Sequence, residues 1–293
     1  MNEITRQNKF FTAYAIAPGV TRIQGLALEN CYLVEGKERA LLIDGLTGIG
    51  SLRAFVREMT ELPLTVALSH GHLDHSGIAW ESGWVYVHPD DVILMRTKEM
   101  SGVQERMDFV EFYHSLGVPF RTEVGKEDVL PPRPLWTLPL RDGDILDLGG
   151  ISIEVVGVPG HTRGSLVFLD RFHRCVYAGD ACNANTLLNL EASASIAEYK
   201  KSLEHFLTYE EEFDVLWSGH DCQAVPRSII RDGIALCERI LTRQDDAIEV
   251  EDRFGGKALL AARRREDCSV RRGGLCNIVY RPETIFENPR PEL

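Results

Sequence analysis

The chain has 293 residues, of which 44% are hydrophobic and 26% charged, a composition typical of a globular protein with a sizeable core. It contains no run of about 18 apolar residues, as a membrane-spanning helix needs, and its start lacks the basic and apolar regions of a secretion signal. The net charge of -12 argues against a nucleic-acid partner, and seven cysteines without CxxC spacing favour a reducing, cytoplasmic location.

Short apolar runs rich in β-branched residues recur along the chain and predict buried strands. They cover 31–34, 40–44, 65–69, 84–88, 151–158, 165–170, 175–180, 214–219 and 276–280. Segments with helical character lie between them, at 51–61, 197–213 and 228–244. Because strands and helices are mixed, we expect helices to cover sheets within a single domain spanning 1–293.

Two parts of the chain resemble each other. In each part, two apolar runs joined by a polar turn end in an aspartate, Asp44 or Asp180. A helical segment follows, and then a strand that ends in a serine and a histidine, at 69–70 and at 218–220. If this is a repeat rather than chance, the domain has two similar halves that collect polar residues along one shared edge.

The segment 89–134 interrupts this pattern with helical periodicity and a proline-rich end. We predict a helical insertion, which is either a lid over a pocket or a pair of helices docked on the body. Its large apolar side chains are Met95, Met100, Met107, Phe109, Phe112 and Tyr113. At the other end of the chain, we expect 285–293 to be a flexible tail.

Residues 70–77 read HGHLDHSG and place three histidines and a carboxylate within six residues. In extended backbone, residues two apart project to the same side, so His70 and His72 can converge on one point. After the turn through Leu73, Asp74 and His75 can converge on a neighbouring point. Neutral imidazoles and a carboxylate suit a cation such as Zn²⁺, which would also remove the repulsion between crowded histidines.

Three more candidate ligands follow predicted strands. His161 lies in a glycine-flanked turn after 151–158, Asp180 ends the run 175–180, and His220 follows 214–219. A single buried histidine is more often structural than a metal ligand. Three such residues in the same context, each after an apolar strand and a small residue, favour a shared metal site.

These residues resemble the HxHxDH motif and the later histidine, aspartate and histidine of the metallo-β-lactamase superfamily. The resemblance runs from about Ala13 to His220, and Asp44 matches the early aspartate of the family. It implies an α+β fold, the four-layer αβ/βα sandwich of that superfamily, with the segment 89–134 as a helical insertion. It also implies a two-metal site along one edge of the facing sheets.

The resemblance further implies a role for each site residue. The first metal would be bound by His70, His72 and His161. The second would be bound by Asp74, His75 and His220. Asp180 would bridge the two metals, and Asp44 would accept a hydrogen bond from a ligand histidine or fix the loop. The two divalent ions would be zinc, with manganese or iron as alternatives, and Asp74 and Asp180 would be the catalytic carboxylates.

The activity implied is that of a dinuclear metallohydrolase that uses a metal-bridging hydroxide. Enzymes of this superfamily that destroy β-lactams usually lack a carboxylate at the position of Asp180, and flavodiiron oxygen reductases carry a glutamate at that of His72. Both branches are therefore disfavoured. We expect cleavage of a carboxylic ester, lactone or thioester of a small molecule, because such leaving groups need little protonation and no other residue stands out as a general acid.

Two alternatives stay open: a phosphodiesterase on a small anionic substrate, and an oxidoreductase like the mononuclear-iron persulfide dioxygenases. The phosphodiesterase would gain from cationic groups near the metals. The candidates are the arginines at 263, 264, 265, 271 and 272, which otherwise form a solvated loop. We expect a small-molecule substrate and no nucleic-acid or membrane partner, and a homodimer is an open alternative to a monomer.

A few polar residues near the predicted ligands have two interpretations each. Asn183 and Asn185 either donate to a substrate carbonyl or form a turn. Cys182 and Cys222 either support the ligands or are small buried residues. His88, His114, His173 and His205 match no motif, so we expect them to be surface or structural residues.

Overall fold

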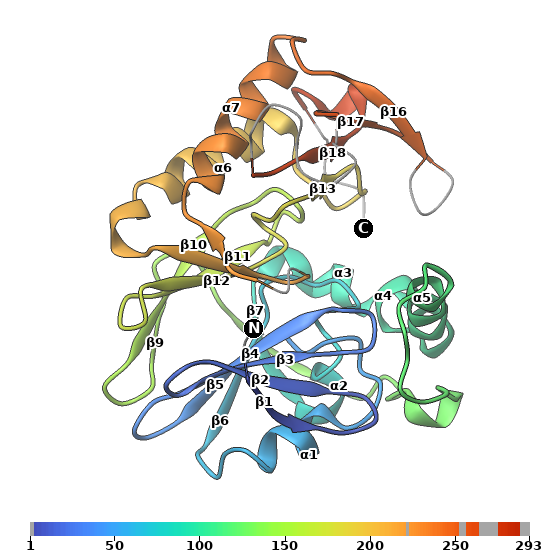
Figure 1. Ribbon diagram of the computed structural model, residues 1–293, viewed down its shortest axis with the longest axis vertical. Coiled ribbons are helices and arrows are strands. Elements are labelled where there is room, and N and C mark those ends of the chain that lie inside the picture. The colour runs from blue at the N-terminus through green and yellow to red at the C-terminus, as the bar shows by residue number, and fades with distance from the viewer. Residues whose placement is uncertain (1–2, 221–222, 252–255, 264–274, 288–293) are drawn as a thin grey trace. The chain divides into compact units, whose positions relative to one another are not determined.

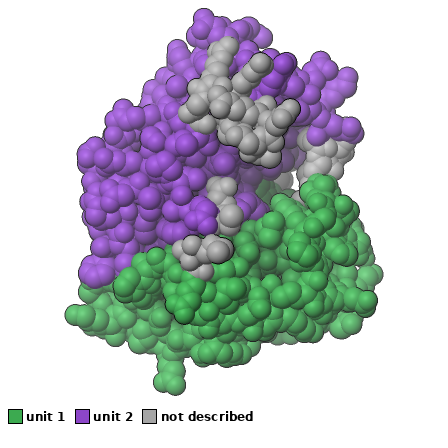
Figure 2. Space-filling model, viewed as in Figure 1, with its two compact units in different colours: residues 1–155 green, residues 156–293 purple. Residues whose placement is uncertain are grey.

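The computed structural model describes residues 3–220, 223–251, 256–263 and 275–287 (Figure 1). It divides into two compact units, Met1–Val155 (unit 1) and Val156–Leu293 (unit 2), which Figure 2 colours separately. Cys222, residues 288–293 of the predicted tail and four of the clustered arginines (264, 265, 271 and 272) lie outside the described residues. Ile285, at the start of the predicted tail, is buried, and its carbonyl accepts the Ala197 N–H.

Unit 1 contains an eight-stranded mixed sheet whose strands follow one another in chain order. The first five strands, β1 to β5, form an antiparallel meander, and β5 to β8 run parallel. The strands are β1 (Glu3–Gln7), β2 (Thr12–Ala17), β3 (Val20–Gln24), β4 (Asn30–Glu35), β5 (Ala40–Ile43), β6 (Leu64–Ala67), β7 (Trp84–Val87) and β8 (Trp136–Pro139). The strands predicted at 31–34, 40–44, 65–69 and 84–88 are therefore confirmed, whereas β1 to β3 were not predicted.

The connections between the parallel strands contain helices, as is usual for parallel pairs. Helix α1 (Leu52–Arg57) joins β5 to β6, and α2 (Ala79–Ser82) precedes β7. Helix α1 begins at Ser51 because the Ser51 hydroxyl accepts the Ala54 N–H at 3.1 Å, which caps the first turn.

The segment between β7 and β8 contains several helices. It contains η1 (Pro89–Asp91), α3 (Val92–Arg96), α4 (Lys98–Ser101), α5 (Val103–Ser115) and η2 (Lys126–Asp128). Met95, Met107 and Phe109 are buried in the core of unit 1, and Met100 and Tyr113 pack against it. These side chains dock the insertion on the body of its own unit.

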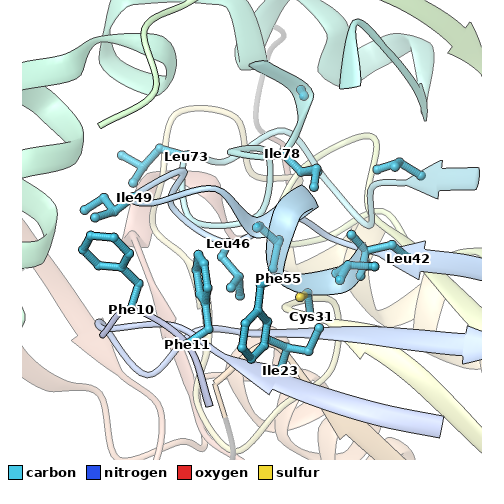
Figure 3. Close-up of a cluster of buried hydrophobic side chains, with 14 of the residues drawn as sticks. Phe10, Phe11, Ile23, Cys31, Leu42, Leu46, Ile49, Phe55, Leu73 and Ile78 are labelled. Carbon is cyan, nitrogen blue, oxygen red and sulfur yellow. The ribbon is translucent and has the colours of Figure 1, made fainter. Parts of the chain in front are cut away.

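The core of unit 1 extends from the meander to the metal-binding motif predicted at 70–77. Phe10, Phe11 and Phe55 pack on one side of it, and Leu46, Ile49, Leu73 and Ile78 are buried in the same cluster (Figure 3). Leu73 lies inside the HGHLDHSG segment and is only 6% exposed. The apolar residue between the two pairs of candidate ligands therefore anchors this segment to the core.

Arg106 of α5 is fully buried and ties the insertion to unit 1. Its guanidinium donates to the carbonyls of Ser101 (2.9 Å), Gly102 (3.3 Å) and Thr47 (3.4 Å), and to that of Leu130. Burial lowers the pKa of Arg106 to about 10, which leaves the side chain protonated at neutral pH. One charged group thus satisfies carbonyls from three separate segments.

We expect Arg106→Met to lower the free energy of unfolding by about 3 kcal/mol, because several buried carbonyls lose a charged donor. Chemical denaturation followed by circular dichroism measures this change. Arg57→Met is the matched control, since exposed Arg57 also donates to a backbone carbonyl, that of Leu62. The control should change stability by less than about 0.5 kcal/mol; equal effects of the two substitutions would contradict a structural role for Arg106.

The second half of the chain forms a six-stranded sheet and a four-stranded sheet. The six-stranded sheet has the order β15-β14-β12-β11-β10-β9, and the four-stranded sheet has the order β13-β18-β17-β16. The strands are β9 (Ile145–Asp147), β10 (Ser152–Gly157), β11 (Leu166–Asp170), β12 (Cys175–Gly179), β13 (Thr186–Leu188), β14 (Val215–Ser218), β15 (Val225–Pro226), β16 (Ile248–Glu251), β17 (Lys257–Leu260) and β18 (Ile278–Tyr280). All five strands predicted in this half are present, as β10, β11, β12, β14 and β18.

Helices α6 (Ile196–Leu207) and α7 (Ile229–Leu241) pack in the core of unit 2, and two short turns complete the elements, η3 (Glu210–Glu212) and η4 (Pro282–Thr284). Helix α6 begins with a capping box. The Ser195 hydroxyl accepts the Glu198 N–H at 3.2 Å, and the Glu198 carboxylate accepts the Ser195 N–H at 2.9 Å. Both helices match predicted helical segments.

The two halves share the predicted repeat. In unit 1, the antiparallel pair β4–β5 is followed by α1 and by β6, which runs parallel to β5. In unit 2, the antiparallel pair β11–β12 is followed by α6 and by β14, which runs parallel to β12. None of the helices in the described part of the chain is long and apolar enough to cross a bilayer.

Candidate functional site

The candidate ligands of unit 1 gather where two parallel strands end. Asp44 follows β5, and Ser69 and His70 follow β6; Ile43 pairs with Ala67, so the two ends lie at the same edge of the sheet. Asp44, Ser69, His70 and His75 are each at most 1% exposed. The local sequence therefore brings a carboxylate and two imidazoles together in a buried environment.

Asp44 organises this group through three hydrogen bonds. Its carboxylate accepts the Ser69 N–H at 2.6 Å and the Ser69 hydroxyl at 2.7 Å. It also accepts Nδ1–H of His75 at 2.9 Å. The predicted roles of Asp44 are to accept a hydrogen bond from a ligand histidine or to fix the loop; its carboxylate contacts both the candidate ligand His75 and the loop residue Ser69.

These contacts also decide the tautomers of His70 and His75. The Ser69 hydroxyl gives its only proton to Asp44, so at its 3.0 Å contact with Nδ1 of His70 it accepts. Nδ1 of His75 likewise carries its proton toward the carboxylate. Both imidazoles therefore carry their lone pair on Nε2, the nitrogen that a metal would bind.

The loop after β5 has a strained backbone and contacts the end of the motif at 70–77. Asp44 (φ 66°) and Leu46 (φ 53°) both adopt the left-handed conformation, which costs a residue with a side chain about 1–2 kcal/mol. The Leu46 carbonyl accepts the Gly77 N–H at 2.8 Å. A side chain at Gly77 would meet the Gly48 backbone N at 2.1 Å, so this close approach requires glycine. Strain of this kind is typical of functional loops.

Within the motif, the donor atoms are close to one another. The rings of His70 and His72 have centroids 4.8 Å apart, and those of His70 and His75 are 4.2 Å apart. Nε2 of His75 lies 3.8 Å from Oδ2 of Asp74. The four predicted ligands of unit 1 thus form one cluster.

Unit 2 repeats this arrangement at the ends of β12 and β14. These strands run parallel, Gly179 pairs with Ser218, and Asp180 and His220 follow directly. Oδ2 of Asp180 lies 3.3 Å from Nε2 of His220 and 3.6 Å from Nε2 of His161. A single carboxylate oxygen therefore faces two imidazole nitrogens.

His161 lies in the turn after β10 and is 3% exposed. Its Nδ1–H donates to the Leu187 carbonyl at 2.8 Å, because a carbonyl can only accept. The Ser193 hydroxyl donates to the carbonyl of His161 itself at 2.9 Å. The ring is therefore fixed with its lone pair on Nε2, the nitrogen that faces Asp180.

The spacing of these atoms fits metal ligands. Two ligand atoms, each about 2.1 Å from a tetrahedral ion, lie about 3.4 Å apart. The separations of 3.3 and 3.6 Å around Asp180 agree with that spacing and exceed the length of an ordinary hydrogen bond, about 2.7–3.2 Å. Imidazole nitrogens and carboxylate oxygens are the donors that zinc and similar divalent ions prefer.

The Asn183 side chain stabilises a turn rather than presenting its amide group to a substrate. Its side-chain oxygen accepts the Asn185 N–H at 2.9 Å. Its amide nitrogen is 3.4 Å from Oδ1 of Asp180, on the opposite side of the carboxylate from the oxygen that faces the histidines. Asn183 therefore contacts the Asp180 carboxylate, a role that was not predicted from the sequence.

The remaining residues singled out in the sequence have structural contacts. His88 accepts the Asp90 N–H at the start of η1, His114 stacks on Phe120, His173 pairs with Asp170 at 2.7 Å, and His205 contacts the Tyr209 ring. Cys182 is buried in the core of unit 2. Among the clustered arginines, Arg263 donates its backbone N–H to Asp246.

The comparison with protein families decides the relationship. The model of the metallo-β-lactamase superfamily matches residues 25–220, which is more than half of the chain and contains every candidate ligand. The chain belongs to the metallo-β-lactamase superfamily. The family predicted from the residues 70–75, 161, 180 and 220 is thus confirmed.

Curated relatives of this chain include enzymes that are 26–28% identical to it over the aligned residues. The acyl-coenzyme A thioesterase MBLAC2 of Gallus gallus is 27% identical over 200 residues, which cover 61% of this chain and 66% of the relative. The human protein of the same name is 26% identical and is covered to 67%. Hydroxyacylglutathione hydrolase GloC of Haemophilus influenzae is 28% identical over 166 residues, covering 52% and 66%. The match spans slightly less than two thirds of the chicken and Haemophilus proteins.

Similar solved structures confirm the fold. A metallo-β-lactamase from Erythrobacter litoralis superposes with a TM-score of 0.57 at 16% identity, over 81% of this chain and all of that one. The sec-alkylsulfatase Pisa1 from Pseudomonas sp. superposes with a TM-score of 0.54 at 16% identity, over 79% and 42%. The predicted fold class, the α+β metallo-β-lactamase fold, is therefore confirmed.

Proposed function

We propose that this protein is a metal-dependent hydrolase that cleaves a thioester of a small molecule. The observation that carries this proposal is the pair of ligand clusters, one in each unit. In both, imidazole Nε2 atoms lie near carboxylate oxygens, at 3.8 Å in unit 1 and at 3.3 and 3.6 Å in unit 2, and hydrogen bonds at Nδ1 select the metal-binding tautomer. Membership of the superfamily supports a hydrolase.

The two clusters together bind two divalent ions in this proposal. One ion is held by His70, His72 and His161. The other is held by Asp74, His75 and His220. Asp180, whose Oδ2 faces His161 and His220, would bridge the two ions. Zinc fits the donor set best, and manganese or iron is the alternative.

Divalent ions in such a site supply a water of lowered pKa and polarise the acyl oxygen. The residues of this chain provide the geometry. Asp44 and Ser69 hold His75 and His70 in one tautomer. Asp74, which is 8% exposed, accepts a hydrogen bond from the attacking water, and Asp180 supplies the negative charge between the two ions. No serine or cysteine nucleophile is required.

A thioester is the substrate class that the relatives favour. MBLAC2 is named an acyl-coenzyme A thioesterase and GloC a hydroxyacylglutathione hydrolase, and both names describe acyl groups carried on a thiol. A thiolate leaving group needs little protonation, which suits a site without a dedicated general acid. Carboxylic esters and lactones share this carbonyl chemistry and rank next.

The compartment is part of the same proposal. Cys31, Cys175, Cys182, Cys237 and Cys276 are buried free thiols, as expected in a reducing cytoplasm. The net charge of -12 disfavours a nucleic-acid partner. We propose a cytoplasmic enzyme with a small-molecule substrate.

A substrate panel tests the proposal. We expect the zinc-loaded protein to show a kcat/KM on an acyl-coenzyme A or acylglutathione that exceeds that on bis-p-nitrophenyl phosphate by at least about 10-fold, a difference of 1.4 kcal/mol in activation free energy. An acyl-homoserine lactone completes the panel, and metal analysis of the same sample should give two equivalents. A preference for the phosphodiester, or a single iron with oxygen uptake on a persulfide, would overturn the proposal.

A further inference from the structure

Asp91 is the residue at which the helical insertion meets the metal-binding motif. It ends η1, precedes α3 as its N-cap residue, and is 2% exposed. An aspartate at this position usually accepts an N–H of its own helix. The Asp91 side chain makes no such capping bond to α3. The usual preference of an N-cap aspartate for a hydrogen bond to its own helix is therefore not satisfied by Asp91.

The carboxylate of Asp91 is directed at the motif instead. Its Oδ2 accepts the Gly71 N–H at 2.7 Å, a short hydrogen bond between groups 20 residues apart. Gly71 is the residue between His70 and His72. A hydrogen bond to a charged acceptor is stronger than one between neutral groups, so it fixes the orientation of this peptide.

The backbones at Gly71 and Asp91 also lie very close to each other. A Cβ at position 71 would lie 2.8 Å from the Asp91 carbonyl oxygen and 3.3 Å from both Asp91 Cβ and Met95 N. Only glycine permits this contact without displacement of η1 or of the motif. Asp91 and Gly71 therefore act as a matched pair.

We propose that Asp91 is a positioning residue for the first metal, acting through the Gly71 peptide on His70 and His72. The orientation of that peptide determines the directions in which the two flanking side chains leave the backbone. His75 is held independently, by Asp44. The effect of Asp91 should consequently fall on one metal equivalent and spare the other. This inference rests on the proposed function in one respect, that His70 and His72 bind a metal.

Metal affinity measured by competition with a chromogenic chelator tests the proposal. We expect Asp91→Ala to raise the Kd of one of two zinc equivalents by about 10–100-fold. Metalloproteins typically show a loss of this size when a residue that orients the metal ligands is removed. Asp91→Asn keeps an acceptor oxygen for Gly71 and should stay closer to wild type. Gly71→Ala, whose added methyl group would push Asp91 away, should weaken the same equivalent, and it replaces Asp91→Ala if that variant does not fold.

Asp128→Ala is the matched control. Asp128 lies in the same insertion, and its carboxylate also accepts a glycine N–H, that of Gly125 at 3.1 Å. We expect it to leave both zinc affinities unchanged. Wild-type zinc affinities in Asp91→Ala and Gly71→Ala, even with a lower melting temperature of the metal-free protein, would reduce Asp91 to a structural residue. Absence of zinc binding by the wild-type protein would instead contradict the proposed function, and this inference with it.

Discussion

Asp180→Ala is expected to lose at least one metal equivalent and to lower kcat/KM by more than about 100-fold. This loss exceeds the reduction of about 10–100-fold that is typical when a residue that hydrogen-bonds to a metal ligand is removed. The reason lies in the position of its Oδ2, which is 3.3 Å from Nε2 of His220 and 3.6 Å from Nε2 of His161. Without this carboxylate, Asp74 would be the only anionic residue among the proposed ligands of two divalent cations. Inductively coupled plasma mass spectrometry and steady-state kinetics measure the two losses.

Thermal stability separates this role from a folding defect. Zinc should raise the melting temperature of the wild-type protein, because a ligand that binds only the folded state stabilises it. The same addition should raise that of Asp180→Ala much less, while the metal-free forms of both proteins unfold at similar temperatures. Asn183→Ala, which removes the amide beside Oδ1 and the acceptor for the Asn185 N–H but no proposed ligand, should cause a smaller loss of activity. Full metal occupancy with unchanged turnover in Asp180→Ala would contradict a two-metal site.

Asp44→Asn is expected to weaken zinc binding by about 10–100-fold and to lower the free energy of unfolding by about 1–3 kcal/mol. The asparagine tolerates the left-handed backbone at this position, where φ is 66°. However, its NH₂ group must face donors, because the carboxylate accepts from Ser69 N–H, from the Ser69 hydroxyl and from His75. The tautomers of His70 and His75 then lose their support.

A second buried aspartate offers a matched control for this substitution. Asp170 also accepts three donors, the His173 N–H at 3.0 Å, Nδ1–H of His173 at 2.7 Å and the Tyr177 hydroxyl at 3.2 Å. His173 is not one of the proposed ligands. Asp170→Asn should therefore cost similar stability without any change in zinc affinity. Equal zinc affinities in the two variants would show that Asp44 supports only the fold.

Most of the strands and helices could be predicted, because the apolar runs are short, buried and bounded by polar turns. The strand at 40–44 and the helix at 197–213 are examples, and both have regular counterparts in the structure. The first strands were missed for the opposite reason. β1 reads EITRQ and is exposed along its whole length, so its residues carry no apolar pattern.

The insertion shows how far a local pattern can be interpreted. Its helical character was evident, but whether its apolar residues form a lid or a docked face was not. Phe109 and Met107 pack in the core of unit 1, which no helical periodicity could decide. Arg106 is the clearest example: an arginine in a helix predicts an exposed charge, and its partners at Thr47 and Leu130 are 59 and 24 residues away.

The sequence by itself determined the family and predicted the candidate ligands, because each group of candidates follows an apolar strand within a few residues. His70, His72, Asp74 and His75 are adjacent in the chain, and His161, Asp180 and His220 each follow an apolar run. Only the tertiary structure decided which groups support them. Asp91 could as well have capped its own helix, and Asn183 could have faced a substrate, since both choices satisfy local rules equally. For Asp91, a contact over 20 residues decided the outcome, because it arises only when the sheet and the insertion pack together. For Asn183, the position of its side chain beside Asp180 and the Asn185 N–H decided it.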